Sequence, residues 1–165
     1  MYFKQEYHPL NGQHLGCIVG VLTDPLTAQP TGSISRTYLD ASLNKIGPAK
    51  TFKTDGMVVG IVRLSEDADV LPGLHLAEGI ESALTTMAEG FRPCWSTGSK
   101  NLMAAFPVIP GIESLTLFAD HDANGAGEKA ARAAEARWRS AGHKARIIIR
   151  DRPGDFNDAV MEGGS

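Results

Sequence analysis

Short apolar segments rich in β-branched residues dominate the first third of the chain and predict strands. Polar clusters containing Pro, Gly, Asp and Asn separate these segments, and no long helical pattern lies between them. Strands that follow one another without a helical crossover favour antiparallel pairing. The predicted strands are residues 15–23, 34–39 and 57–64. We therefore expect a small, mainly antiparallel β-region over residues 1–70.

The pattern changes after a polar stretch at residues 65–73 (SEDADVLPG), which Pro72 interrupts. Beyond it, short buried strands alternate with amphipathic helical segments, an order typical of a parallel sheet with helices on its faces. The strands are expected at 74–77, near 94–95, at 115–119 and at 145–149, and the helices at 80–88, 101–106, 127–141 and 154–161. We expect a single α/β domain over residues 74–162, with the polar stretch as its boundary.

Residues that commonly cap helices support these helix assignments. Ser99 precedes the second predicted helix, and a serine hydroxyl there can accept a hydrogen bond from the first turn. Gly90 and Gly142 lie just after the first and third predicted helices, where glycine is common. The third helix also has acidic and basic residues four positions apart, which stabilise a helix.

The composition is that of an ordinary folded domain, with 42% hydrophobic and 21% charged residues. It excludes a disordered or fibrous protein. The formal net charge of −3 gives no general attraction to nucleic acid. The charge is uneven, because residues 128–152 carry eight Lys or Arg and only three Asp or Glu. This basic segment fits either a solvated helix face or a surface that follows a nucleic-acid backbone.

Nothing in the sequence indicates a membrane protein or an exported one. No run approaches about 18 consecutive apolar residues, and the first ten residues lack a charged and then apolar leader. Cys17 and Cys94 do not form a CxxC pair, which argues against a structural zinc site. We expect a cytoplasmic protein with reduced cysteines and no membrane partner.

Acidic residues follow three of the predicted strands, and ligands of α/β sheets collect at the carboxyl ends of strands. Clustered carboxylates repel one another unless a cation neutralises them. Mg²⁺ and Mn²⁺ accept carboxylate oxygens and leave positions for phosphate oxygens. The candidate ligands are Glu78, Asp120, Asp122, Asp155 and Asp158. The alternative is that these acids only solvate loops, form turns or cap helices.

Three segments resemble the acidic motifs of the Toprim domain, which primases, topoisomerases and some nucleases share. They are HLAEGIESAL (75–84), LTLFADHDANGAGEKAA (115–131) and GDFNDAV (154–160). Their form is most similar to that of phage- and plasmid-type primases and primase-helicases. The upstream strands, with SRTYLD at 35–40, resemble the segment that precedes Toprim in the same proteins. The resemblance implies a Rossmann-like Toprim fold, with about four parallel strands and flanking helices.

The resemblance also implies roles for the acids. Glu78, Asp120 and Asp122 are expected to be catalytic and to hold one or two Mg²⁺ or Mn²⁺ ions. Either Asp155 or Asp158 is expected to complete the ligand set. Paired metal ions can stabilise both the attacking and the leaving oxygen of a phosphoryl transfer.

Four basic residues are candidate contacts for nucleotide or nucleic-acid phosphates. For Arg36, Lys50 and Lys53 in the leading β-region, the resemblance implies contacts with a triphosphate or a template phosphate. Lys100 lies beside a predicted helix start, which favours anions. Each of the three residues in the β-region could equally be an ordinary solvated charge.

The resemblance implies magnesium-dependent nucleotidyl transfer by the catalytic core of a DNA primase. Its partners would be single-stranded DNA template and nucleoside triphosphates. The sequence has no zinc-ribbon cysteines and no Walker A loop, so a helicase or a template-reading module is expected in cis or in trans. The alternatives are a Toprim-type metal-dependent nuclease and a non-catalytic nucleic-acid-binding module.

Overall fold

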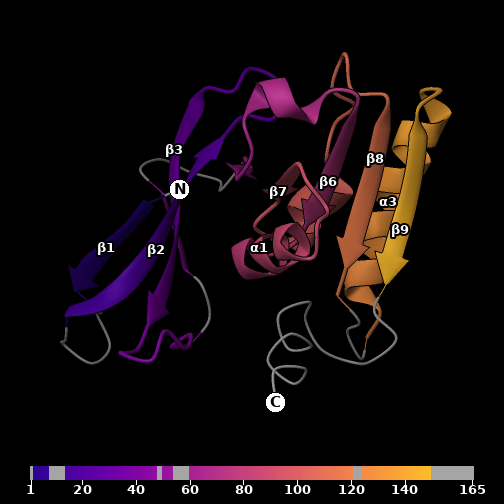
Figure 1. Cartoon of the computed structure of the whole chain (residues 1–165). Helices are drawn as coiled ribbons and strands as arrows, with labels where there is room; N and C mark the ends of the chain where they lie inside the picture. The colour runs from indigo at the N-terminus through magenta and orange to yellow at the C-terminus, as the bar shows by residue number, and fades with distance from the viewer. Residues whose placement is uncertain (1, 8–13, 48–49, 54–59, 121–123, 150–165) are drawn as a thin grey trace. The chain divides into compact units, whose positions relative to one another are not determined.

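The computed structural model describes residues 2–7, 14–47, 50–53, 60–120 and 124–149. The chain divides into two compact units, Met1–Gly60 and Ile61–Ser165. The first unit contains a four-stranded, fully antiparallel sheet in the order β1-β2-β3-β4 (Figure 1). Its strands are β1 (Tyr2–Tyr7), β2 (His14–Thr23), β3 (Pro30–Leu39) and β4 (Lys50–Lys53). An antiparallel sheet is confirmed, and it contains the strands predicted at 15–23 and 34–39 together with β1 and β4, which the pattern did not predict. Of the strand predicted at 57–64, residues 57–59 lie outside the described residues, and Val62–Arg63 pair in the second sheet.

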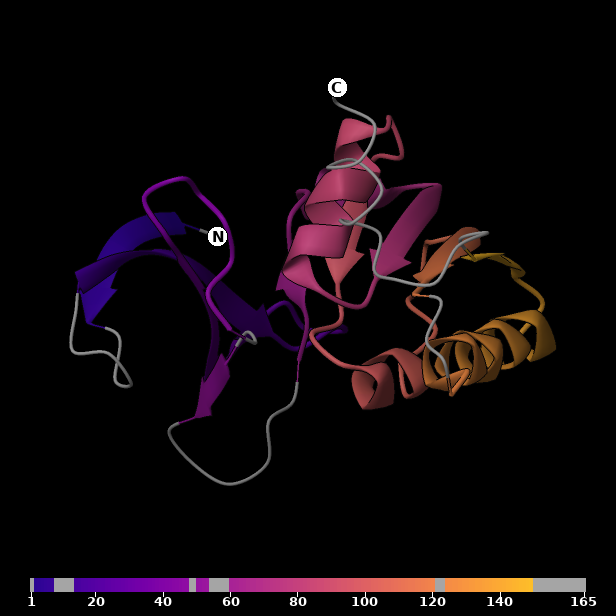
Figure 2. The ribbon, with the colours of Figure 1, turned by 90° about the horizontal axis from the view of Figure 1, so that it is seen from below.

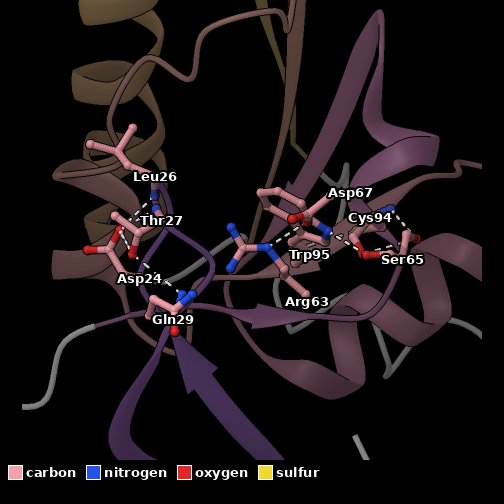
Figure 3. A network of polar contacts seen from close by, with 9 residues as sticks. All are labelled: Asp24, Leu26, Thr27, Gln29, Arg63, Ser65, Asp67, Cys94 and Trp95. Atoms are coloured by element: carbon pink, nitrogen blue, oxygen red, sulfur yellow. Dashed lines mark hydrogen bonds and ion pairs between the residues drawn. The ribbon is translucent and has the colours of Figure 1, made fainter.

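The longest pairing of the first unit is the hairpin formed by β2 and β3. Cys17 is paired with Tyr38 across the two strands, and both are buried with Val19 in a small apolar cluster. The carboxylate of Asp24 forms the connecting turn, because its Oδ1 accepts the backbone N–H of Thr27 at 2.7 Å (Figure 3). Alternation along β2 therefore buries one apolar face, as its sequence pattern predicts.

The second unit contains a five-stranded sheet in the order β5-β7-β6-β8-β9. The four strands β7, β6, β8 and β9 are parallel, and β5 pairs antiparallel with β7 at the edge. The strands are β5 (Val62–Arg63), β6 (Gly73–Ala77), β7 (Cys94–Ser96), β8 (Ser114–Ala119) and β9 (Lys144–Ile149). The helices are η1 (Asp67–Val70, a 3-10 turn), α1 (Ile80–Ala88), α2 (Lys100–Ala104) and α3 (Ala126–Ser140). The predicted α/β class and its four parallel strands are confirmed.

Helices cover both faces of this sheet. Helix α1 packs on β6 and β7 from one side, while α2 and α3 pack together on the other side, where α3 covers β8 and β9 (Figures 1 and 2). The core beneath α3 is the larger one, and Trp95, Leu117 and Trp138 are fully buried in it. Among the described residues, no helix is long and apolar enough to cross a membrane.

The predicted caps and helix pairs are present. Ser99 Oγ accepts the backbone N–H of Leu102 at 3.3 Å, so this serine caps α2. Gly90 and Gly142 follow α1 and α3 with positive φ values. Glu135 forms an ion pair with Arg139, four positions later on α3.

The boundary between the units lies earlier than the polar stretch 65–73 that the sequence suggested. Strand β5 precedes that stretch, yet it pairs with β7 of the second sheet, with Val62 opposite Ser96. Residues in and just after β5 also contact Trp95 of β7 (Figure 3). The indole N–H of Trp95 donates to the carbonyl of Ser65 at 2.9 Å, and the Arg63 guanidinium lies 4.5 Å from the Trp95 ring centroid. Pairing between segments more than 30 residues apart sets this boundary, and a change in composition along the chain cannot show such pairing.

Candidate acidic site at the carboxyl edge of the second sheet

Two of the predicted acids lie at the ends of neighbouring strands. Glu78 directly follows β6 and Asp120 directly follows β8, and these two strands are parallel partners. Ala77 is paired with Phe118, so Glu78 and Asp120 leave the same edge of the sheet within about one residue of register. Adjacent strands are about 4.8 Å apart. Both side chains are half-buried, so this edge places two carboxylates near one another and partly out of water.

The end of β7 and the loop that follows it fix the backbone at Glu78. The carbonyl of Glu78 accepts hydrogen bonds from the Gly98 N–H at 2.7 Å and from Ser96 Oγ at 2.8 Å. The Thr97 N–H donates to the carbonyl of Ala77 at 3.0 Å, and both Ser96 and Thr97 are fully buried. Gly98 has φ +73°, a conformation that side-chain-bearing residues rarely adopt. The segment therefore holds the start of the acidic edge rigidly in place.

Sequence reasoning did not single out these loop residues as part of the site. It read the segment around Ser99 only for a helix cap and for Lys100. The available signal was a run of small hydroxyl residues directly after a buried strand, next to a glycine. Their role depends on hydrogen bonds to a residue 18–20 positions earlier, which no local pattern predicts.

A third carboxylate, that of Glu81, lies beside the same strand end. Glu81 is in the first turn of α1, and its Oε2 lies 3.4 Å from the position that a Cβ on Gly79 would take. One carboxylate oxygen of Glu81 and one of Glu78 are buried. The amino end of a helix favours negative charge, which suits Glu81 in this turn. The sequence signal was its position three residues after Glu78, at a predicted helix start.

Comparison with known families now identifies the fold. A family model described as the Toprim domain matches residues 74–165, which is more than half of the chain. The chain belongs to the Toprim domain family. No curated protein sequence matches it significantly.

Two solved primase structures share the fold of this Toprim protein. One is a DNA primase domain from Pseudomonas aeruginosa, with a TM-score of 0.57 and 16% identity, covering 98% of this chain and 53% of that chain. The other is the Aquifex aeolicus primase (zinc binding and RNA polymerase domains), with a TM-score of 0.54 and 18% identity, covering 95% of this chain and 40% of that chain. This chain therefore spans about half of the first structure and less of the second.

Toprim domains bind divalent metal ions, and the donor groups at this edge suit them. Glu78 and Asp120 offer anionic oxygens, which Mg²⁺ and Mn²⁺ prefer as ligands. Within the described parts of the chain, no three His, Cys, Asp or Glu side chains are grouped tightly enough to hold a metal. Asp122, Asp155 and Asp158 lie outside the described residues. Glu78 and Asp120 are thus suitable ligands for a divalent ion, and further carboxylates would have to complete the ligand set.

The turn between β8 and α3 bears on the alternative reading of the acids as turn formers. Asn124 Oδ1 accepts the backbone N–H of Ala126 at 3.1 Å, and Gly125 is the N-cap residue of α3. Asn124 is therefore the residue that forms this local hydrogen bond next to the helix. Asp120, six residues before α3 begins, is not its N-cap residue.

The predicted phosphate-binding residues lie in both units. In the first unit, Arg36 on β3 is paired with Lys50 on β4, and Lys53 on the same strand is paired with Ser33. Arg36 is half-buried, and its Nε atom is buried. In the second unit, Lys100 is the first residue of α2 and is also half-buried. Within the first unit, the structure brings Arg36 and Lys50 together in register.

Proposed function

We propose that this Toprim protein is the catalytic core of a DNA primase of the phage or plasmid type. It would join nucleoside triphosphates into primers on a single-stranded DNA template. The observation that supports a primase is the breadth of the structural likeness, which extends over 98% of the chain and so includes the antiparallel sheet. A Toprim domain alone would suit a nuclease as well. The likeness of both units to primase domains favours nucleotidyl transfer.

In this proposal the carboxylates of Glu78, Asp120 and Asp122 hold Mg²⁺ or Mn²⁺, and Asp155 or Asp158 completes the set. When bound, the ion would stabilise the charge that develops on the phosphate oxygens during transfer. The hydrogen bonds that fix the backbone at Glu78 keep the first carboxylate in position before substrate arrives.

The basic residues would neutralise phosphates of the incoming triphosphate or of the template. Arg36 and Lys50 are register partners, so two cationic residues stand at adjacent positions of one sheet. A guanidinium can bind a phosphate through two parallel hydrogen bonds, and an ammonium acts as a point charge beside it. Lys53 and Lys100 would serve further phosphates. A helicase or a template-reading module, in cis or in trans, would deliver the single strand.

The test is incorporation of labelled ribonucleotides on single-stranded DNA with Mg²⁺ or Mn²⁺. The wild-type chain is compared with Asp120→Asn and with the matched control Asp69→Asn, which removes the same charge from an exposed position on η1. The proposal predicts incorporation by the wild type and by the control, and none above background by Asp120→Asn.

The two alternative functions, a nuclease and a non-catalytic binding module, predict different results in the same assay. Metal-dependent degradation of the DNA without any need for nucleotides would identify a nuclease. DNA binding without either reaction, unchanged by Asp120→Asn, would identify a non-catalytic binding module. Each of these results would overturn the primase proposal.

A further inference from the structure

One face of the second sheet is covered on only part of its width. Helix α3 covers β8 and β9 from one side, whereas α1 on the other side lies over β6 and β7 (Figure 1). Helix α1 reaches β8 at Phe118, which is buried in one cluster with Ala83 of the helix, and Ile148 of β9 packs against the same cluster. The amino-terminal halves of β8 and β9 lie outside this cluster, and Arg146 there is exposed.

Two rows of polar residues run across the amino-terminal halves of the strands on this face. Parallel register pairs β6 with β8 and β8 with β9, so alternate residues of the three strands stand side by side. The rows are Gly73, Ser114 and Lys144, and then His75, Thr116 and Arg146. The residues between the two rows are apolar and belong to the buried core. The two rows form one continuous polar surface, called here the cationic rows.

The cationic rows line a cavity of about 300 Å³. No Asp or Glu is among the described residues that line it. Gly73 leaves room at one end, because a Cβ there would lie only 2.8 Å from Ser114 Oγ. The described lining of the cavity thus combines two cations, two hydroxyl groups and an imidazole, and none of these described residues carries a carboxylate.

Hydrogen bonds orient the side chains of the second row. Arg146 donates from Nε to Thr116 Oγ1 at 3.0 Å, which extends the guanidinium across β8. His75 Nδ1 donates to the carbonyl of Pro93 at 2.9 Å, since a carbonyl can only accept. Its ring also packs edge-on against Phe91, with centroids 5.8 Å apart. With Nδ1 committed to Pro93, Nε2 is the nitrogen of His75 that remains for a ligand.

Two arginines of the basic segment 128–152, Arg137 and Arg139, are used differently. On α3, Arg137 donates to the carbonyls of Ala104 and Phe106, and Arg139 donates twice to the carbonyl of Ala145. These two arginines are structural and favour the solvated-helix interpretation for α3. Lys144 and Arg146 are exposed, and neither forms an ion pair within the described residues. Among the described cations of this segment, Lys144 and Arg146 are the two that line the cavity.

We propose that the cationic rows bind an oxyanion of the phosphate class, with Arg146 and Lys144 supplying charge and Thr116, Ser114 and His75 supplying polar contacts. A guanidinium beside a hydroxyl is suited to phosphate, because both can donate to its oxygens. The site is distinct from the acidic edge. His75 lies within β6 and Glu78 directly follows this strand three residues later, and an extended chain rises about 3.3 Å per residue. The inference therefore stands whether or not the proposed function is correct.

The test is titration of the ¹⁵N-labelled full chain with inorganic phosphate, followed by NMR at constant ionic strength. EDTA is present, so that no divalent ion links phosphate to the acidic edge. We expect saturable shifts of the backbone amides in the cationic rows. Arg146→Gln and Lys144→Gln should each weaken binding about tenfold, as the loss of a charged hydrogen bond does.

Lys129→Gln is the matched control, because Lys129 is exposed on α3 and its replacement changes the net charge equally. Binding should be unchanged in this variant. Shifts that do not saturate by roughly 50 mM phosphate would overturn the proposal. So would equal weakening by Lys129→Gln, and the two β9 cations would then serve only to protect an edge strand.

A second titration identifies the source of the phosphate. The probes are a single-stranded oligonucleotide without terminal phosphates and a nucleoside triphosphate, both in EDTA. Arg146-dependent shifts with the oligonucleotide would assign the site to a nucleic-acid backbone. Arg146-dependent shifts with the triphosphate alone would assign it to free phosphate groups. Either result supports the site. The absence of Arg146-dependent shifts with the oligonucleotide, with the triphosphate and with inorganic phosphate would contradict it.

Discussion

The two ends of the same parallel strands carry opposite charges. Glu78 and Asp120 follow the carboxyl ends of β6 and β8, whereas the amino-terminal halves of β6, β8 and β9 carry the cationic rows. The acids stand just beyond the last paired residue, on backbone that is leaving the sheet. The cations stand within the paired strands, where register decides which residues are neighbours.

This difference separates two ways of building a polar site on a sheet. At the carboxyl end, loops fix the geometry, and the segment Ser96–Thr97–Gly98 does so for Glu78 through backbone hydrogen bonds. Along the strands, side-chain alternation and strand register fix the geometry, as they do for His75, Thr116 and Arg146. A change at the first kind of site should therefore alter chemistry, and a change at the second kind should alter binding of an anion only.

The largest effect is expected from Asp120→Asn. Activity should fall by at least about 100-fold, because removing one group that stabilises transition-state charge costs that much. Stability without metal should hold or rise slightly, since Glu78 and Asp120 end neighbouring strands and removing one charge lessens their repulsion. Thermal melts with and without Mg²⁺ test this, and the metal should stabilise the wild type but not the variant. Equal stabilisation of both proteins would show that Asp120 is not a ligand.

Ser96→Ala should produce the next largest effect. Ser96 Oγ donates to the carbonyl of Glu78, so its loss should cost about 1 kcal/mol and loosen the acidic edge. We expect a roughly tenfold loss of kcat and a weaker response to Mg²⁺. Thr86→Val is the control, because Thr86 loses a comparable buried hydrogen bond within α1, to the carbonyl of Ser82. If both variants lose stability but neither loses Mg²⁺ response, the loop does not position the site.

A smaller effect, on the free energy of unfolding, distinguishes a structural arginine of α3 from an arginine of the cationic rows. Arg137→Gln removes hydrogen bonds to the carbonyls of Ala104 and Phe106 and should lower the free energy of unfolding by about 1 kcal/mol. Arg146→Gln should change it by less than about 0.5 kcal/mol, because Arg146 is exposed and donates only to Thr116. Urea unfolding measures both. A larger loss for Arg146→Gln would mean that the cationic rows are a structural network.

The smallest effect is a pH dependence of stability at His75. Burial lowers the pKa of His75 below its usual 6.5, the hydrogen bond to the carbonyl of Pro93 raises it, and the positive charge of Arg146 lowers it. The unfolded chain therefore takes up this proton at a higher pH than the folded one does. Stability from this group is complete above pH 6.5 and is lost as the pH falls through the folded pKa.

His75→Gln should make this decline shallower, as measured by urea unfolding between pH 5 and pH 7.5. Bound phosphate should make it shallower as well, because a nearby anion raises the pKa of an imidazole. An unchanged slope in His75→Gln would assign the decline to other groups.

Much of the second unit could be predicted from its sequence, because its signals are local. Alternation of strand and helix placed β6, β8 and β9 correctly, and Ser99 was recognised as a cap from its position alone. Glu78 and Asp120 were placed at one edge because parallel strands share their carboxyl ends. The resemblance to Toprim motifs added the family, which the family model confirms.

The remaining features depend on pairing between distant segments. Strand β5 joins the second sheet only through β7, more than 30 residues later. The cationic rows exist because the register joins His75, Thr116 and Arg146 from three separate strands. Neither arrangement leaves a periodic pattern in the chain, so a single sequence could not show them.

The most direct test of the acidic edge is Mn²⁺ titration of the ¹⁵N-labelled protein, since a bound paramagnetic ion broadens the nearest amide signals first. We predict that the amides of Glu78, Gly98 and Asp120 broaden at the lowest Mn²⁺ concentration, and those of Gly73 and Ser114 much later. Asp120→Asn should abolish this preference. Broadening that begins elsewhere in the chain, or that is the same in Asp120→Asn, would contradict a divalent metal site at the carboxyl ends of β6 and β8.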